Sequence, residues 1–262
     1  MLTIPTDIFV IEGTTLTNLF KIVALFSSLE FLGYLGTRLV GAKKGLLIQG
    51  FCGGFISSTM THLRITRNTA LDAYPPRVIA QALLLSTVSM LFECIFIAYT
   101  LHPHAKQLIA PFVAQIILLI LAILFFQHAK SAAKSTAVQV VDDNDDPIIW
   151  KKMIYLSLFI ITLTYVMRYI SHTLKLPYAV SAFLVSLFEA HGVLVASMTE
   201  FSDLTEIPRA TEVVIVVLAG NVISKTFFVM RSKRKDIRIP TLVPLYISFI
   251  AAVVIGLTKV PL

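Results

Sequence analysis

Several ionisable side chains lie inside long apolar stretches of the sequence, where a charge is costly and usually serves a function. They are Glu30, Glu93, Arg168, Glu189, His191 and Lys225. Glu189 and His191 are the strongest candidates, because they fall near the middle of the run SAFLVSLFEAHGVLVASM. A carboxylate at that depth could bind a cation, and a histidine beside a carboxylate can exchange a proton near neutral pH.

Joint action of Glu189 and His191 requires a distorted backbone, because residues two apart do not share one face of a regular helix. Gly192 would permit such a distortion. In the alternative interpretation, each residue is an ordinary polar group that is hydrogen-bonded at a helix interface. Both interpretations stay open from the sequence alone.

Other polar residues in the apolar runs suggest helix contacts. Asn221 and Lys225 are one turn apart and would share a helix face, where Asn221 could hydrogen-bond to another helix. Lys225 could instead extend its ammonium group to the lipid headgroups, since the basic cluster RSKRK follows it. Glu30 and Arg168 could pair with each other as supporting charges, and Glu93 is a third supporting residue.

The composition places these residues in a membrane. Of 262 residues 56% are apolar and 14% are charged, whereas soluble domains have roughly 25% charged residues. Apolar runs that approach the roughly 20 residues needed to cross a bilayer indicate an all-α polytopic membrane protein. They fall at about 16–40, 46–63, 77–101, 107–128, 153–173, 178–199, 209–230 and 240–259.

The run FCGGFISSTMTHLRITRN is unusual for a membrane span, because it contains adjacent glycines and several hydroxyls. Gly53 and Gly54 permit a break or a close helix crossing. Ser57, Ser58 and Thr59 could satisfy freed backbone groups or line a polar cavity, where irregular backbone is tolerated at membrane depth. The alternative is an ordinary span with a packing face of small residues.

The chain also repeats itself with an offset of 132 residues. The offset places the following residues in register: Lys43 with Lys175, Ser57 with Glu189, Thr59 with His191, Pro76 with Pro208, Arg77 with Arg209 and Glu93 with Lys225. The Pro-Arg pair begins an apolar helix in both halves. We therefore expect a first membrane repeat over 1–128, a polar linker over 129–151 and a second repeat over 152–262.

The distribution of basic residues tests how the halves are oriented, because cytoplasmic loops are enriched in Lys and Arg. Eight full spans distribute the basic residues evenly over both faces. If 46–63 and 178–199 are broken segments that return to the face they came from, one face keeps only Lys21, Lys106, Lys175, Arg209 and Lys259. This bias favours about six full spans, two broken or re-entrant segments and inverted repeats. Eight spans in a parallel 4+4 arrangement are the alternative.

Enzyme motifs are missing from the sequence. It contains no H-E-x-x-H, no G-x-S-x-G and no phosphate-binding loop. We therefore predict no catalytic residues, no metal site and no cofactor. The net charge of +7 and the segment MRSKRKDIR suit a cytoplasmic face next to anionic lipid rather than nucleic acid.

Three motifs resemble those of a known family. They are Gly41-Ala-Lys-Lys-Gly45, Gly53-Gly-Phe-Ile-Ser-Ser-Thr59 and Asn221-Val-Ile-Ser-Lys225. In this order they resemble the C-terminal membrane domain of unknown function in MgtC/SapB-like proteins, here as a stand-alone version. The family pattern differs at two places, because this chain has histidine at 191 where the family tends to have an acid and an acid at 93 where it tends to have arginine.

The resemblance implies a multi-pass protein of the inner membrane with a role in transport or its regulation. We expect a transporter or channel for a small ion or solute, cation-selective or proton-coupled, with its site where the two broken segments meet. The alternative is a regulator without transport activity that binds another membrane protein. A homo-oligomer is compatible with either function.

Overall fold

The structure of the chain is a computed structural model. It describes residues 10–11, 14–15, 46–68, 71, 74–102, 105–128, 162, 169, 177–187, 189–201 and 204–259. A short antiparallel pair, β1 (Val10–Ile11) and β2 (Thr14–Thr15), is the only strand structure in these ranges. All other elements are helical, which confirms the all-α class.

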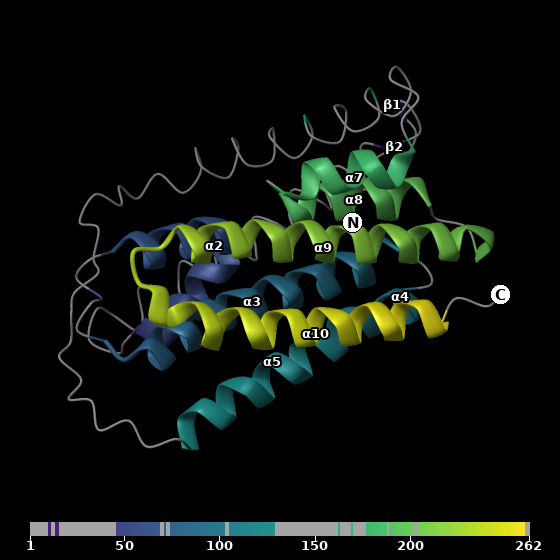
Figure 1. Cartoon of the computed structure of the whole chain (residues 1–262). Helices are drawn as coiled ribbons and strands as arrows, with labels where there is room; N and C mark the ends of the chain where they lie inside the picture. The colour runs from purple at the N-terminus through teal and green to yellow at the C-terminus, as the bar shows by residue number, and fades with distance from the viewer. Residues whose placement is uncertain are drawn as a thin grey trace, which may run out of the picture.

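The helices fall into two groups along the chain (Figure 1). The first group consists of α2 (Leu46–Arg67), α3 (Pro76–Leu101), α4 (Ala105–Leu108) and α5 (Ala110–His128). The second consists of α7 (Tyr178–Ser186), α8 (Ala190–Glu200), the 3₁₀ turn η2 (Leu204–Glu206), α9 (Ile207–Arg231), the 3₁₀ turn η3 (Lys235–Ile237) and α10 (Arg238–Lys259).

Within the described ranges, three helices are long and apolar enough to cross a membrane. They are Pro76–Leu101, Ile207–Arg231 and Lys235–Thr258, and they coincide with the predicted runs 77–101, 209–230 and 240–259. In the described ranges the expected six to eight spans are not reached: α5 is shorter, and the interrupted runs 46–63 and 178–199 exclude the alternative of eight full spans. The runs 16–40 and 153–173 and the linker 129–151 lie outside the described residues, except for isolated positions 162 and 169.

The two longest helices begin at the Pro-Arg pairs. Pro76 and Pro208 each lie in the first turn, where the missing N–H has no helical partner to lose and the fixed φ suits the helix. α3 ends at Leu101, one residue before His102, whose backbone is extended because Pro103 follows it. A proline in the first turn therefore marks the start of both α3 and α9.

α2 is a helical hairpin rather than a continuous helix. Its backbone is extended at Ser57, with φ −170° and ψ 109°. A Cβ atom on Gly53 would lie 2.7 Å from Thr61 Oγ1, whereas residues eight apart on one helix are separated by about 12 Å. Leu46 and Ile65, near the two ends of α2, pack in one apolar cluster. The segment therefore returns to the end where it began, and the alternative of an ordinary span is wrong.

α7 and α8 form a second hairpin. The backbone at Glu189, just before α8, is also extended, with φ −146° and ψ 111°. At the other end of the hairpin, the Tyr178 hydroxyl lies 3.4 Å from Ser197 Oγ, and its ring meets the Phe201 ring at a centroid distance of 4.9 Å. The start of α7 thus lies beside the end of α8, and this segment is broken as well.

The long helices α3 and α9 run antiparallel. Ile79, near the start of α3, packs with Val229, near the end of α9. Midway along, Asn221 Nδ2 of α9 lies 2.8 Å from Met90 Sδ of α3. In Figure 1, α2 lies at one end of this pair and α7 with α8 at the other. The two hairpins therefore extend toward the middle of α3 and α9 from opposite ends.

Polar contacts fasten the base of each hairpin to the long helix of the other half. Ser232 Oγ, just after α9, donates to the Thr66 carbonyl of the first hairpin at 3.1 Å. His102 Nε2, just after α3, hydrogen-bonds to the Phe201 carbonyl of the second at 2.7 Å. Each hairpin is thus anchored at its base to the other half of the chain.

Small residues allow the hairpins to cross the long helices closely. A Cβ on Gly54 would clash with the backbone of Ser86 and with Ser89 Oγ on α3. In the second half the glycine is on the long helix and the serine is on the hairpin. A Cβ on Gly220 of α9 would clash with Ser186 Oγ of α7. Backbones approach this closely only where side chains are minimal.

This packing predicts that Gly54→Ala destabilises the protein by about 1–3 kcal/mol, because the added methyl group meets backbone atoms that cannot move aside. Gly256→Ala is the matched control, since its Cβ would meet the end of a flexible side chain, Ile215 Cδ1, at 3.0 Å. The thermal unfolding midpoint of both variants in detergent measures the difference. Equal midpoints would contradict the close crossing.

Candidate functional site

Both hairpin tips are stabilised by a side chain that caps the returning helix. Ser57 Oγ accepts a hydrogen bond from the Met60 N–H at 3.3 Å, and Glu189 Oε1 accepts one from the His191 N–H at 2.9 Å. Serine and acidic side chains satisfy such helix N-termini well. Ser57 and Glu189 are 132 residues apart, so the break occurs at the same position of both repeats.

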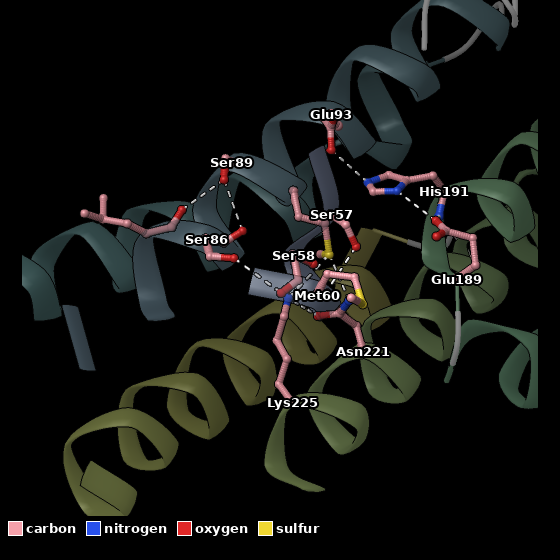
Figure 2. A network of polar contacts seen from close by, with 12 residues as sticks. Ser57, Ser58, Met60, Ser86, Ser89, Glu93, Glu189, His191, Asn221 and Lys225 are labelled. Carbon is pink, nitrogen blue, oxygen red and sulfur yellow. Dashed lines mark hydrogen bonds and ion pairs between the residues drawn. The ribbon is translucent and has the colours of Figure 1, made fainter. Parts of the chain in front are cut away.

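Glu189, His191 and Glu93 form a charged triad (Figure 2). His191 Nδ1 lies 2.9 Å from Glu189 Oε1, and His191 Nε2 lies 3.1 Å from Glu93 Oε2. The Glu93 side chain is 3% exposed, whereas those of His191 and Glu189 are 13% and 20% exposed. A ring that faces a carboxylate with each nitrogen needs a proton on both nitrogens or on one of the carboxylates.

The distortion that this triad requires occurs at Glu189 itself. Because the Glu189 backbone is extended, its side chain folds back over the first turn of α8 and reaches both the backbone and the ring of His191. The two side chains therefore contact each other despite their spacing, and a joint role stays a prediction.

Lys225 belongs to a second polar group, on α9. Its Nζ donates to Asn221 Oδ1 at 2.5 Å and to Met90 Sδ at 3.4 Å. Lys225 is 1% exposed, so the idea that it reaches the headgroups is wrong. Its ammonium group is held inside the bundle by Asn221, as their spacing of one turn suggested.

A serine of α3 and a histidine of the first hairpin hydrogen-bond to a backbone carbonyl near the tip of that hairpin. The Ser58 carbonyl accepts a hydrogen bond from Ser86 Oγ at 3.5 Å and lies 2.9 Å from His62 Nδ1. Ser89 Oγ donates back to α3 carbonyls. Ser58, Ser86 and His62 are all buried. The freed backbone at the tip is thus satisfied within the protein, as a low-dielectric environment requires.

The two charged groups contact the same stretch of α3. Met90, which contacts Lys225, and Glu93, which contacts His191, are three residues apart and therefore neighbours on the helix surface. We call the residues of both groups, together with the tip serines, the central polar cluster. It consists of Met90 and of Ser57, Ser58, Ser86, Ser89, Glu93, Glu189, His191, Asn221 and Lys225 (Figure 2).

The predicted site residues are largely brought together. Gly54 provides the close crossing and Gly53 the contact between the arms of the first hairpin, although the break itself is at Ser57 and not at the glycines. Thr59 directly follows Ser58 in the chain, is half-buried and is not part of the cluster. The supporting candidates Arg168 and Glu30 lie outside the described residues.

Sequence reasoning missed His62, Ser86 and Met90. His62 could have been found, since it is an ionisable residue just inside an apolar run. The hydroxyl pattern in STVSM was a weak signal for Ser86. Met90 carried no signal, because its role depends on the crossing of α3 and α9.

The helices and the buried charges together define a helical membrane protein. Its polar centre is built around two hairpins, each formed by a helical segment that is interrupted at its tip. The chain belongs to the family described as a domain of unknown function, DUF4010, whose profile it matches over residues 24–232. No curated protein sequence and no solved structure matches the chain.

The contact between Asn221 and Lys225 predicts an asymmetric effect on stability. Asn221→Leu should destabilise the protein by about 1–3 kcal/mol, because it removes the acceptor of a buried ammonium group. Lys225→Met should be close to neutral, and the double variant should be more stable than Asn221→Leu alone. A double-mutant cycle of thermal midpoints measures this coupling, and simple additivity would contradict it.

Proposed function

We propose that the protein is a transporter or channel for a small cation, coupled to protons, with its site at the central polar cluster. The observation that carries this proposal is the pair of interrupted hairpins, whose caps Ser57 and Glu189 occupy equivalent repeat positions. Interrupted helices that meet near the middle of a repeat interface are typical of binding sites in secondary transporters.

The charge balance of the cluster supports a cation as the substrate. Glu93 and Glu189 contribute two negative charges and Lys225 one positive charge, so the cluster lacks one positive charge when His191 is neutral. An uncompensated buried charge is expensive. A proton shared by His191 and its carboxylates, or one monovalent cation, completes the balance, and exchange of one for the other would couple cation movement to protons.

The exposed fractions of the triad side chains suggest which groups would bind the cation and which would exchange a proton. Glu189 and His191 are the more exposed members, whereas Glu93 is almost fully buried. We therefore assign Glu189 as the cation-binding carboxylate and His191 as the proton-exchanging group. Cys94, next to Glu93 on α3, Lys225 on α9 and His62 of the first hairpin are the other titratable groups described in this region.

We further propose that the two repeats are inverted in the membrane. The antiparallel α3 and α9 and the hairpins that enter from opposite ends support this arrangement. It places the basic segment after α9 and Arg67 on the cytoplasmic face, in agreement with the positive-inside rule. The chain would be a multi-pass protein of the inner membrane.

The relation to MgtC/SapB-like proteins also remains a proposal. It rests on the three motifs of the sequence, since the family match is to DUF4010. Two of them contribute to the centre of the fold: the glycine-serine motif forms the first tip, and the Asn221–Lys225 motif holds the buried ammonium group. We therefore expect these two motifs to form a polar site within the membrane region.

Ion flux in liposomes tests the transport proposal. With purified protein and a pH-sensitive dye enclosed, a gradient of Na⁺, K⁺ or Li⁺ should drive proton movement. Glu189→Gln should reduce this signal to that of protein-free liposomes, because the amide cannot balance a cation. Glu212→Gln, at an exposed position of α9, is the matched control and should retain flux.

The same assay tests the proton-exchanging role of His191. His191→Gln should flatten the dependence of flux on pH between about pH 5 and 8, where histidine titrates, while the protein stays folded. An unchanged pH profile would contradict the role of His191. Absence of flux in the native protein, together with a membrane protein that copurifies with it, would instead favour the regulator.

Cysteine labelling tests the inverted topology. In a background without Cys52 and Cys94, Arg67→Cys and Glu200→Cys place a thiol at the base of each hairpin. A reagent that does not cross the membrane should label the two from opposite faces, because the hairpins open at opposite ends. Labelling of both from one face would contradict inverted repeats.

A further inference from the structure

A groove of about 800 Å³ opens between α3, α5 and α10, at the end of the bundle away from the second hairpin. This volume is within the range of small-molecule sites in proteins. The groove is separate from the central polar cluster, because none of its lining residues belongs to the cluster. Transport by the cluster does not explain it.

Most of the groove wall is apolar and open to the surroundings of the bundle. Phe125 of α5 and Ile239 and Ile247 of α10 line it and are 72%, 75% and 56% exposed. From Asp236 to Ile247 the groove follows α10 for about 16 Å, at 1.5 Å per residue. A hydrocarbon chain could therefore lie along it from the helix end into the membrane region.

The groove becomes polar at the helix ends. Arg77, in the first turn of α3, and Asp236, in η3, line this end. Asp236 is already paired with Arg234, whose guanidinium group also donates to the Tyr74 carbonyl at 2.8 Å. The adjacent turn carries the basic residues Arg231, Lys233, Arg234, Lys235 and Arg238. The positive charge outweighs the single carboxylate, so this end attracts an anion.

Prolines make the groove rigid. Pro75 and Pro76 form the wall at the start of α3, and Pro240 and Pro244 form the wall on α10. Proline fixes φ, and inside a helix it removes a backbone hydrogen bond and bends the helix. A ligand would therefore enter a preformed surface and lose less affinity to the ordering of the protein.

We propose that this groove binds an anionic phospholipid of the bilayer, with an acyl chain against α5 and α10 and the phosphate at Arg77. A basic pocket between membrane helices on the cytoplasmic side is the arrangement that recognises such headgroups. The apolar length of the groove distinguishes the lipid from free phosphate, and its opening to the surroundings of the bundle suits a ligand that arrives from the membrane.

Native mass spectrometry of the purified protein tests this proposal. The protein is exposed to equal amounts of phosphatidylglycerol and phosphatidylcholine with identical acyl chains, and the retained lipids are counted. The native protein should retain phosphatidylglycerol in several-fold excess. Arg77→Gln should remove most of this excess. Arg209→Gln should leave it unchanged, because Arg209 is the repeat counterpart of Arg77 and does not line the groove.

A second pair of variants tests the acyl-chain wall. Ala122→Trp fills the groove and should reduce retention of both lipids, whereas Leu121→Trp, at an exposed neighbour that does not line it, should not. If Ala122→Trp does not fold, Val243→Trp fills the groove from α10. Equal retention of the two lipids by the native protein, equal losses in the two arginine variants, or full retention after the groove is filled would overturn the proposal.

Discussion

A backbone that is interrupted inside an apolar bundle must satisfy its freed hydrogen-bonding groups within the protein, and the rest of this structure depends on that constraint. Ser57 and Glu189 meet it by capping the returning helices. The caps place a hydroxyl in one half and a carboxylate in the other at the same repeat position. The second of these brings a negative charge into the centre, where Glu93 adds another and His191 and Lys225 are the basic groups.

The sequence predicted which two segments are broken better than where each of them breaks. The offset of 132 residues identified Ser57 and Glu189 as counterparts, and the charge distribution indicated that both segments are broken. The glycines were expected to permit either a break or a close crossing, and they serve the crossing. The break occurs at Ser57, because a cap determines where the new helix begins. The burial of Lys225 could not be predicted, since its partner Met90 comes from a helix 135 residues away in the chain.

The central polar cluster contains elements of both halves, and neither half could build it alone. α3 contributes Ser86 and Glu93, the second hairpin contributes Glu189 and His191, and α9 contributes Lys225. A change in the position of either hairpin would alter the contacts of these charges. This arrangement joins the charge balance of the cluster to the packing of the hairpins.

The reversal of the chain at Ser57 is the central claim, and a disulfide tests it most directly. A Cβ on Gly53 would lie 3.7 Å from Thr61 Cβ, close to the mean separation of about 3.8 Å in disulfides. Gly53→Cys with Thr61→Cys, in a background without Cys52 and Cys94, should therefore form an intramolecular bond under mild oxidation, and both thiols should resist alkylation in the mass spectrum of the intact protein. Full alkylation of both thiols after oxidation would show a continuous helix, with these residues about 12 Å apart, and would contradict the hairpin.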